Sequence, residues 1–191
     1  MDWELPVQER VYLRELAKKQ ADYAALPVME QRKKMWYDLN DGKAGARPPF
    51  IVETWTFDRD FMPENVYRCT SKLGRSVETQ LLRNVRNHEL INDDKVIPDT
   101  FDVHWAVRAD EFGIKLEKVS VQDAQGVALG YQYIHPLKNL KTDLPMLKPA
   151  TFSVSREATK ERMAFLQDLL GELNDVWRAF RRLRKVVTPR T

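Results

Sequence analysis

The sequence predicts a mixed α/β fold, and two patterns lead to that prediction. A β-branched and aromatic segment at 50–55, an amphipathic helix at 72–91 and an apolar segment at 95–98 follow one another along the chain. This order spans about fifty residues, enough for the long crossover that a parallel strand pair requires. Two alternating runs within 114–134, separated by the glycine-bearing turn 123–126, predict a β-hairpin with one solvated face.

The composition is that of a soluble globular protein of about one domain. The chain has 191 residues, of which 43% are hydrophobic and 31% are charged, and this balance excludes disordered and collagen-like classes. No apolar run approaches the roughly 20 residues that cross a bilayer, and the acidic start Met1–Glu4 is unlike a signal peptide. The lone Cys69 forms neither an internal disulfide nor, by itself, a zinc site. We therefore expect a cytoplasmic protein that makes no membrane contact.

The charge distribution disfavours a nucleic-acid-binding protein. The formal net charge is +3, but the residues from Arg178 onward are basic without any acid, so the rest of the chain is slightly acidic. Nucleic-acid-binding domains carry a broad basic footprint instead. The basic tail has two interpretations, an anionic-surface contact or a solvated helix end whose cations complement the helix dipole, and we favour the second.

Two helices and a strand are expected in the first third of the chain. Apolar residues recur at helical spacing over 7–25, and Leu26-Pro27 ends this run. A second helix over about 29–39 ends at the turn residues Asn40–Gly42. Adjacent prolines then precede the strand at 50–55, in the position where strands tolerate proline.

The later elements follow from the same rules. The apolar stripe of the helix at 72–91 is followed by a polar turn and the strand at 95–98. After the hairpin, the proline-punctuated segment 135–152 reads as a connector. The last helix begins near Ser153 or Ser155, either of which is a good N-cap, and its extension to Lys185 is left open.

Four side chains are candidate catalytic residues: Asp99, Glu53, Asp102 and His104. Three of them lie in a polar and aromatic segment that directly follows the strand at 95–98, where α/β active sites gather. Glu53 lies near the end of the first strand, beside Trp55, and at a pocket mouth it could transfer a proton. In the alternative interpretation, Asp99 and Asp102 cap backbone amides of a turn and Glu53 faces solvent.

Motifs for metal, phosphate or nucleophile chemistry are not found. His88, His104 and His135 do not occur in metal-binding spacings, so no metal site is expected. The glycines form neither a phosphate-binding loop nor a nucleophile elbow.

Short motifs, taken in order, carry a resemblance to a known family. They are Met35–Asp41, Arg47–Val52, Asp94–Asp99, Glu111–Glu117 and His135–Leu144. With a helical lead-in before them, they resemble the N-terminal part of the uroporphyrinogen decarboxylase superfamily, which also contains cobamide-dependent methyltransferases. The likeness covers residues 10–173.

The resemblance implies a (β/α)8 barrel with its pocket at the C-terminal ends of the strands. Residues 50–55 would be the first barrel strand and Lys95–Asp99 the second, with Asp99 resembling the acidic residue that holds pyrrole nitrogens. Decarboxylases follow their first strand with an Arg-Gln-Ala-Gly-Arg stretch, where this chain has Thr54–Asp58. Losing guanidiniums that clamp carboxylates argues against uroporphyrinogen as substrate. A corrinoid-linked cofactor stays open, and the methyltransferase zinc ligands have no counterpart in this chain.

Length limits how much of such a barrel the chain can form. A complete barrel needs about 250 residues, so we expect a partial (β/α)8-barrel-like fold, from a truncated, split or shortened relative. The expected division is a helical lead-in at 1–47, an α/β barrel-like portion at 48–175 and a basic tail at 176–191. Because an open sheet exposes its edges, we expect a homo-oligomer or a companion chain that supplies the remaining barrel.

Two functions are compatible with this picture. The first is lyase or corrinoid-linked methyl-transfer chemistry in a completed barrel, with the isolated chain inactive. The alternative is a non-catalytic assembly module in which the polar segment after the second strand is structural.

Overall fold

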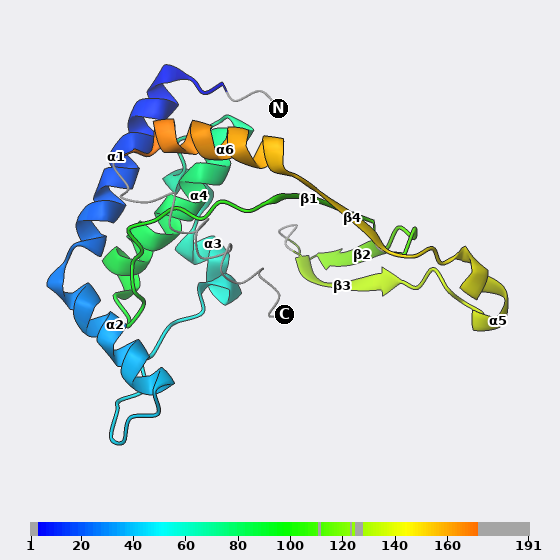
Figure 1. The fold of residues 1–191 in the computed structure, drawn as a ribbon, viewed down its shortest axis with the longest axis horizontal. Coiled ribbons are helices and arrows are strands. Elements are labelled where there is room, and N and C mark those ends of the chain that lie inside the picture. The colour runs from blue at the N-terminus through cyan, green and yellow to red at the C-terminus, as the bar shows by residue number, and fades with distance from the viewer. Residues whose placement is uncertain (1–3, 111, 123, 125–127, 172–191) are drawn as a thin grey trace, which may run out of the picture. The chain divides into compact units, whose positions relative to one another are not determined.

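The computed structural model describes residues 4–110, 112–122, 124 and 128–171. The chain divides into two units, which are treated separately: residues 4–104 with 160–171, and residues 105–159. Helices and small antiparallel sheets make up the described chain, which confirms a mixed α/β composition (Figure 1). The predicted basic tail at 176–191 lies outside the described residues.

Long helices form the first unit, and they confirm the helices expected from the sequence. They are α1 (Val7–Ala24), α2 (Pro27–Asn40), α4 (Lys72–Arg86) and the part of α6 (Arg156–Leu169) that follows residue 159. Shorter turns of helix are η1 (Thr54–Phe57), α3 (Asp58–Phe61), η2 (Glu64–Val66) and the π-helical η3 (Asn87–Ile91). Helix periodicity is a local property of the sequence, which is why the long helices could be predicted.

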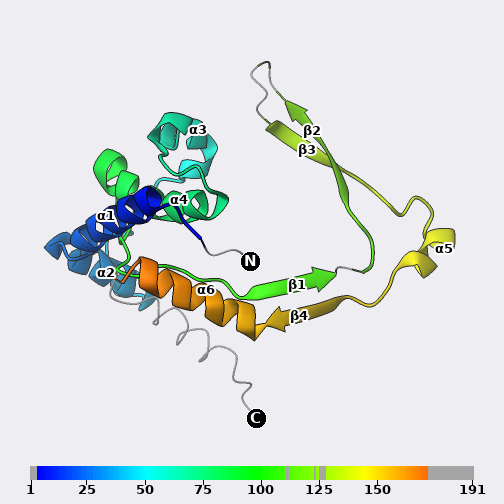
Figure 2. The same ribbon diagram turned by 90° about the horizontal axis from the view of Figure 1, so that it is seen from above.

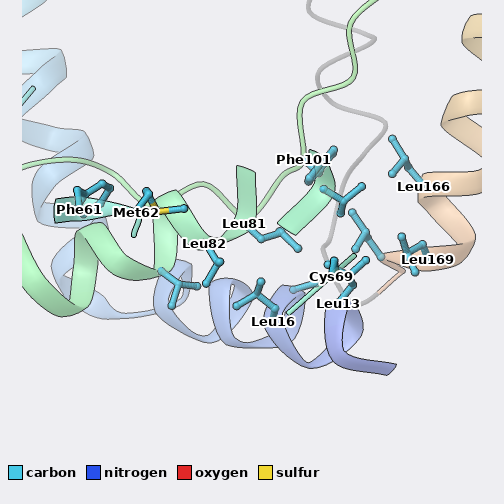
Figure 3. Packing of buried hydrophobic residues seen from close by; sticks show 14 residues of the cluster. Leu13, Leu16, Phe61, Met62, Cys69, Leu81, Leu82, Phe101, Leu166 and Leu169 are labelled. Carbon is cyan, nitrogen blue, oxygen red and sulfur yellow. The ribbon is translucent and has the colours of Figure 1, made fainter. Parts of the chain in front are cut away.

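The core of the first unit lies where α1, α4 and the end of α6 meet (Figure 3). Leu13, Leu81 and Leu169 are fully buried there, and Cys69 and Phe101 close the cluster from the intervening segments. Burying one leucine side chain contributes about 1.5–3 kcal/mol. This cluster is therefore the main source of stability in the unit.

Glu9 of α1 fixes the start of α4. Its carboxylate accepts hydrogen bonds from the backbone amides of Thr70 (2.8 Å) and Ser71 (3.1 Å) and from both of their hydroxyls. Burial alone would raise the pKa of Glu9, but these hydrogen bonds outweigh it and lower the pKa. Gly74 in the first turn of α4 permits the contact, because a Cβ at that position would collide with Glu9 Oε2.

Glu78 of α4 binds the backbone amides of the two residues that precede Thr70 and Ser71 in the chain. Its oxygens accept from the amides of Arg68 (2.7 Å) and Cys69 (3.0 Å), and the side chain is completely buried. Ser71 caps α4 through its hydroxyl, which accepts from Gly74 N at 3.0 Å. The segment that leads into α4 is thus held by carboxylates from both sides.

The predicted parallel strands at 50–55 and 95–98 are wrong. Residues 50–53 and 95–98 are irregular, residues 54–55 begin η1, and every strand pairing in the described residues is antiparallel. Their first residues lie side by side, but aspartate side chains bind the amides that a strand ladder would use: Asp94 accepts from Phe50 N, and Asp93 accepts from Val52 N. One backbone hydrogen bond, from Asp94 N to Phe50 O, joins the two segments.

The second unit consists of two short antiparallel pairs (Figure 2). The strands β2 (Glu117–Gln122) and β3 (Ala128–Ile134) pair with Glu117 opposite Ile134, which confirms the predicted hairpin. Its turn lies partly outside the described residues. The strands β1 (Ala106–Asp110) and β4 (Thr151–Ser155) pair with Ala106 opposite Ser155, a pairing that the sequence analysis did not predict.

The connector between β3 and β4 contains α5 (Leu140–Asp143) and the 3-10 turn η4 (Leu144–Met146). Ser155, the last residue of β4, accepts a hydrogen bond through Oγ from Ala158 N at 3.2 Å, which confirms Ser155 as the N-cap of α6.

A Glu9→Gln substitution should destabilise the protein by about 1–3 kcal/mol at pH 7, because buried amide donors lose a charged acceptor. Since the folded pKa of Glu9 is lowered, its contribution is complete above the ordinary value of 4.5 and is lost as pH falls through the folded pKa. Urea unfolding from pH 7 to pH 3 should therefore show the wild-type advantage shrinking only below about pH 4.5.

The matched control is Glu15→Gln on the exposed side of the same helix. It should change the free energy of unfolding by less than about 0.5 kcal/mol. Equal losses in the two variants would contradict the role assigned to Glu9.

Cys69 should react slowly with a thiol reagent such as DTNB. The side chain is 1% exposed, and burial, followed by the charges of Glu78 and Glu9, raises its pKa to about 12. Because the thiolate is the reactive species, labelling at pH 8 should proceed through unfolding and accelerate strongly in urea. Immediate labelling of the native protein would show that this part of the core is open.

Candidate functional site

A pocket of about 150 Å³ in the first unit is the strongest candidate site. It lies among the 51–54 segment, the end of α3, the last turns of α4 and the turn before residue 96. Its lining residues are Ile51, Val52, Thr54, Phe61, Arg83, Asn87 and Lys95. The lining thus combines three apolar side chains with four polar ones, so it offers both packing contacts and hydrogen-bonding groups.

Asn87 lies in the pocket lining at the point where α4 changes into a π-helical turn. At η3 the hydrogen bonding changes to the π pattern, and Asn92 N donates to Asn87 O at 2.7 Å. Asn92 closes the turn in the left-handed conformation, with φ of 52°. Such π turns are frequent at functional sites. Asn87 is 2% exposed, and within the described chain its Oδ1 has no hydrogen-bond partner.

Arg32 of α2 holds the turn that carries Lys95. Its guanidinium donates to Lys95 O at 3.0 Å and to Asn92 Oδ1 at 2.8 Å, and the side chain is buried. Trp36, one turn further along α2, donates its indole N–H to Asp94 O at 3.2 Å. These contacts fix the backbone at the pocket, so the position of Lys95 is defined by helix α2.

Lys95 and Arg83 give the pocket a positive character. Burial lowers the pKa of Lys95, the nearby Asp93 carboxylate partly offsets that effect, and Arg83 adds to it. Arg83 is already ion-paired with Asp58, at 2.7 Å. Among the described residues, Arg83 is thus ion-paired with one acid, and Lys95 is the second cation of the lining.

The wall formed by residues 51–54 is attached through Asp94 and Asp93. Asp94 accepts two hydrogen bonds from Arg47 at 2.7 Å and one from Phe50 N at 2.8 Å. The hydrogen bond from Phe50 N lowers the pKa of Asp94; burial opposes it, and Arg47 reinforces it. The Asp94 carboxylate therefore stays ionised at neutral pH, and the wall formed by residues 51–54 remains attached.

The four residues predicted as catalytic are not joined by any hydrogen bond or ion pair among the described residues. Glu53 flanks the pocket between two lining residues, but its carboxylate is exposed and accepts from Trp55 Nε1 at 2.8 Å. Asp99 lies in a half-buried turn, beside carbonyls that accept from Gln20. Asp102 and His104 are exposed further along the chain.

The pocket residues Asn87, Lys95 and Arg83 were missed in the sequence analysis. Asn87 and Arg83 look like ordinary polar positions on an amphipathic helix, although the structure buries Asn87. Lys95 carried a weak signal, as a lysine directly before the apolar pair Val96-Ile97 in a segment expected to be buried.

A second, more open pocket of about 490 Å³ lies on the second unit. Residues of β3 and the segment after it line most of it, together with Val119 of β2. In the described residues, no group of three or more His, Cys, Asp or Glu side chains is arranged to hold a metal ion.

None of the described helices combines the length and the apolar character that crossing a bilayer requires. Comparison of the chain with family models, curated proteins and solved structures gives no match.

Proposed function

We propose that this chain is the N-terminal portion of a barrel protein that resembles the uroporphyrinogen decarboxylase superfamily. In this proposal the remaining strands, from a second copy or a companion chain, pack onto residues 50–57. The completed protein then carries out lyase or corrinoid-linked methyl-transfer chemistry. The proposal rests on the sequence resemblance and on one observation, the exposed apolar surface of this segment.

Four large apolar side chains within residues 50–57 are exposed to solvent. Phe50 is 65% exposed and Trp55 is 72% exposed, and Ile51 and Phe57 are also open to solvent. Contiguous exposed apolar side chains mark surfaces that another protein segment covers. The segment at 93–94 binds this stretch through the Asp94 side chain and one backbone hydrogen bond, which hold its first residue in place.

In the completed barrel, Glu53, Asp99, Asp102 and His104 are proposed to line the pocket as proton-transfer or positioning groups. Asp99 has the place that the resemblance gives to the acidic residue facing pyrrole nitrogens. The stretch Thr54–Asp58 supplies no guanidinium, which favours a substrate with fewer carboxylates than uroporphyrinogen.

A non-catalytic assembly module is the second candidate, and the second unit favours it. Both of its sheets have two strands, and exposed apolar side chains such as Phe152 and Val119 lie along them. Two-stranded pairs are marginally stable on their own and gain stability by adding strands.

The chain should associate in solution through residues 50–57. Light scattering should give a mass above that of the 22.4 kDa monomer, and a Phe50→Glu/Trp55→Glu variant should shift it toward the monomer, because buried charge opposes association. The control is Val7→Glu, another exposed apolar position, which should leave the mass unchanged. A wild-type chain that is monomeric and unfolds cooperatively would contradict the proposal.

Titration with cobalamin and with a porphyrin, followed by absorbance, tests the proposed catalytic function. The associated protein should shift the absorbance of one of them, and Asp99→Asn should weaken that binding about tenfold by removing a charged acceptor. Asp22→Asn, at an exposed position of α1, is the control. Absence of any spectral change in an associated protein would favour the assembly module.

A further inference from the structure

The strand pair formed by β1 and β4 (Figure 2) has one apolar face and one mainly polar face. Val107 lies directly opposite Val154, and Ala109 lies directly opposite Phe152. Residues that lie opposite each other in an antiparallel pair share a face, and so do residues two apart in one strand. These four side chains therefore form one surface, the β1–β4 apolar face. The other face is mainly polar and includes Arg108, Asp110, Thr151, Ser153 and Ser155.

The described chain leaves the β1–β4 apolar face open to solvent. Phe152 is 80% exposed, Val107 is 56% exposed and Val154 is 42% exposed, and Ala109 is exposed as well. An isolated pair of strands is marginally stable in water, and it gains stability when its apolar face packs against another element. The alternation of apolar and polar residues therefore indicates that a further surface covers this face.

Size and charge restrict what can cover the face. Four side chains on two five-residue strands bury far less than the roughly 800 Å² per partner of a stable complex, so the face matches a surface as small as itself. None of the four carries a charge, so two copies of the face meet without repulsion. The β2–β3 hairpin differs, because Glu117 shares a face with Val119 and Ile134 there.

The arrangement of large and small side chains fits a second copy of the same face. Consider two stacked sheets related by a two-fold axis that runs parallel to the strands, midway between β1 and β4. Phe152 then lies opposite Ala109 of the second copy, and Val154 lies opposite Val107 of the second copy. Stacked sheets lie about 10 Å apart, and the small Ala109 leaves room for the ring between them.

We propose that the β1–β4 apolar face binds the same face of a second copy of this chain. The two sheets stack into a four-stranded sandwich, and the contact uses the same residues on both copies. This surface is separate from residues 50–57, and the contact does not require a completed barrel. Because the contact is small, we expect a weak dimer with a dissociation constant on the order of 100 µM.

Sedimentation equilibrium of the full chain tests the contact. The Phe50→Glu/Trp55→Glu variant is the background, because it removes the association proposed for residues 50–57. A dimer should persist in it, and adding Phe152→Ala should weaken that dimer at least about tenfold, since the largest side chain of the face is lost. The matched control is Tyr131→Ala, which removes a 61% exposed aromatic ring from the hairpin and should leave the dissociation constant unchanged.

Ala109→Phe, in the same background, separates association from folding. The added ring fills the space that faces Phe152 of the second copy, so the dimer should weaken about tenfold or more. Within a single chain the new side chain forms an aromatic cross-strand pair with Phe152, which stabilises the strand pair. Loss of the dimer is therefore expected together with an unchanged or higher Tm.

Cross-linking locates the contact. A short bismaleimide should link two copies of an Ala109→Cys chain, whereas Arg108→Cys, on the polar face of the same strand, should give far less linked dimer. The native Cys69 is buried and contributes little, because a buried thiol reacts slowly.

A dimer that Phe152→Ala and Ala109→Phe both leave unchanged would overturn the proposal, and so would equal cross-linking at positions 108 and 109. A background variant that stays monomeric at about 1 mM, ten times the expected dissociation constant, would also overturn it. That last result would leave the face to a companion chain. It would not affect the association proposed for residues 50–57, which the mass of the wild-type chain tests separately.

Discussion

The carboxylate of Glu9 is the constraint on which the packing of α4 against α1 depends. Together with Glu78 it binds four consecutive backbone amides, those of residues 68–71, in the segment that leads into α4. A segment buried between two helices must satisfy its backbone amide donors, and carboxylates do so more strongly than neutral acceptors. The apolar cluster around Leu13 and Leu81 then forms between two helices whose relative position is already fixed.

The same chemistry explains why helices could be predicted from the sequence and the sheet could not. Helical periodicity at 7–25 and 72–91 depends on neighbours in sequence, and the hairpin at 114–134 depends on one turn. A strand at 50–55 needs a partner whose amides and carbonyls match its own. Here Asp93 and Asp94 satisfy the amides of Val52 and Phe50 with side-chain oxygens, and no ladder forms.

The residues of the candidate site could likewise be predicted only in part. The sequence analysis found Glu53, which flanks the pocket, because a carboxylate beside aromatic residues can be recognised from the sequence alone. It could not find Asn87, because a polar residue at the end of an amphipathic helix gives no sign that its side chain is buried. Arg32 holds the turn that follows the π-helical residues through its hydrogen bonds to Asn92 and Lys95.

One segment links the candidate pocket physically to the association surface proposed at 50–57. Residues 51–54 form a wall of the pocket, and the exposed apolar side chains at 50–57 begin on the same stretch of chain. A protein segment that covers this stretch removes water from around Lys95, whose pKa burial already lowers. The charged lysine then becomes more costly unless an anion pairs with it. Covering residues 51–54 therefore disfavours the charged form of Lys95 unless the covering segment brings an acid close to it.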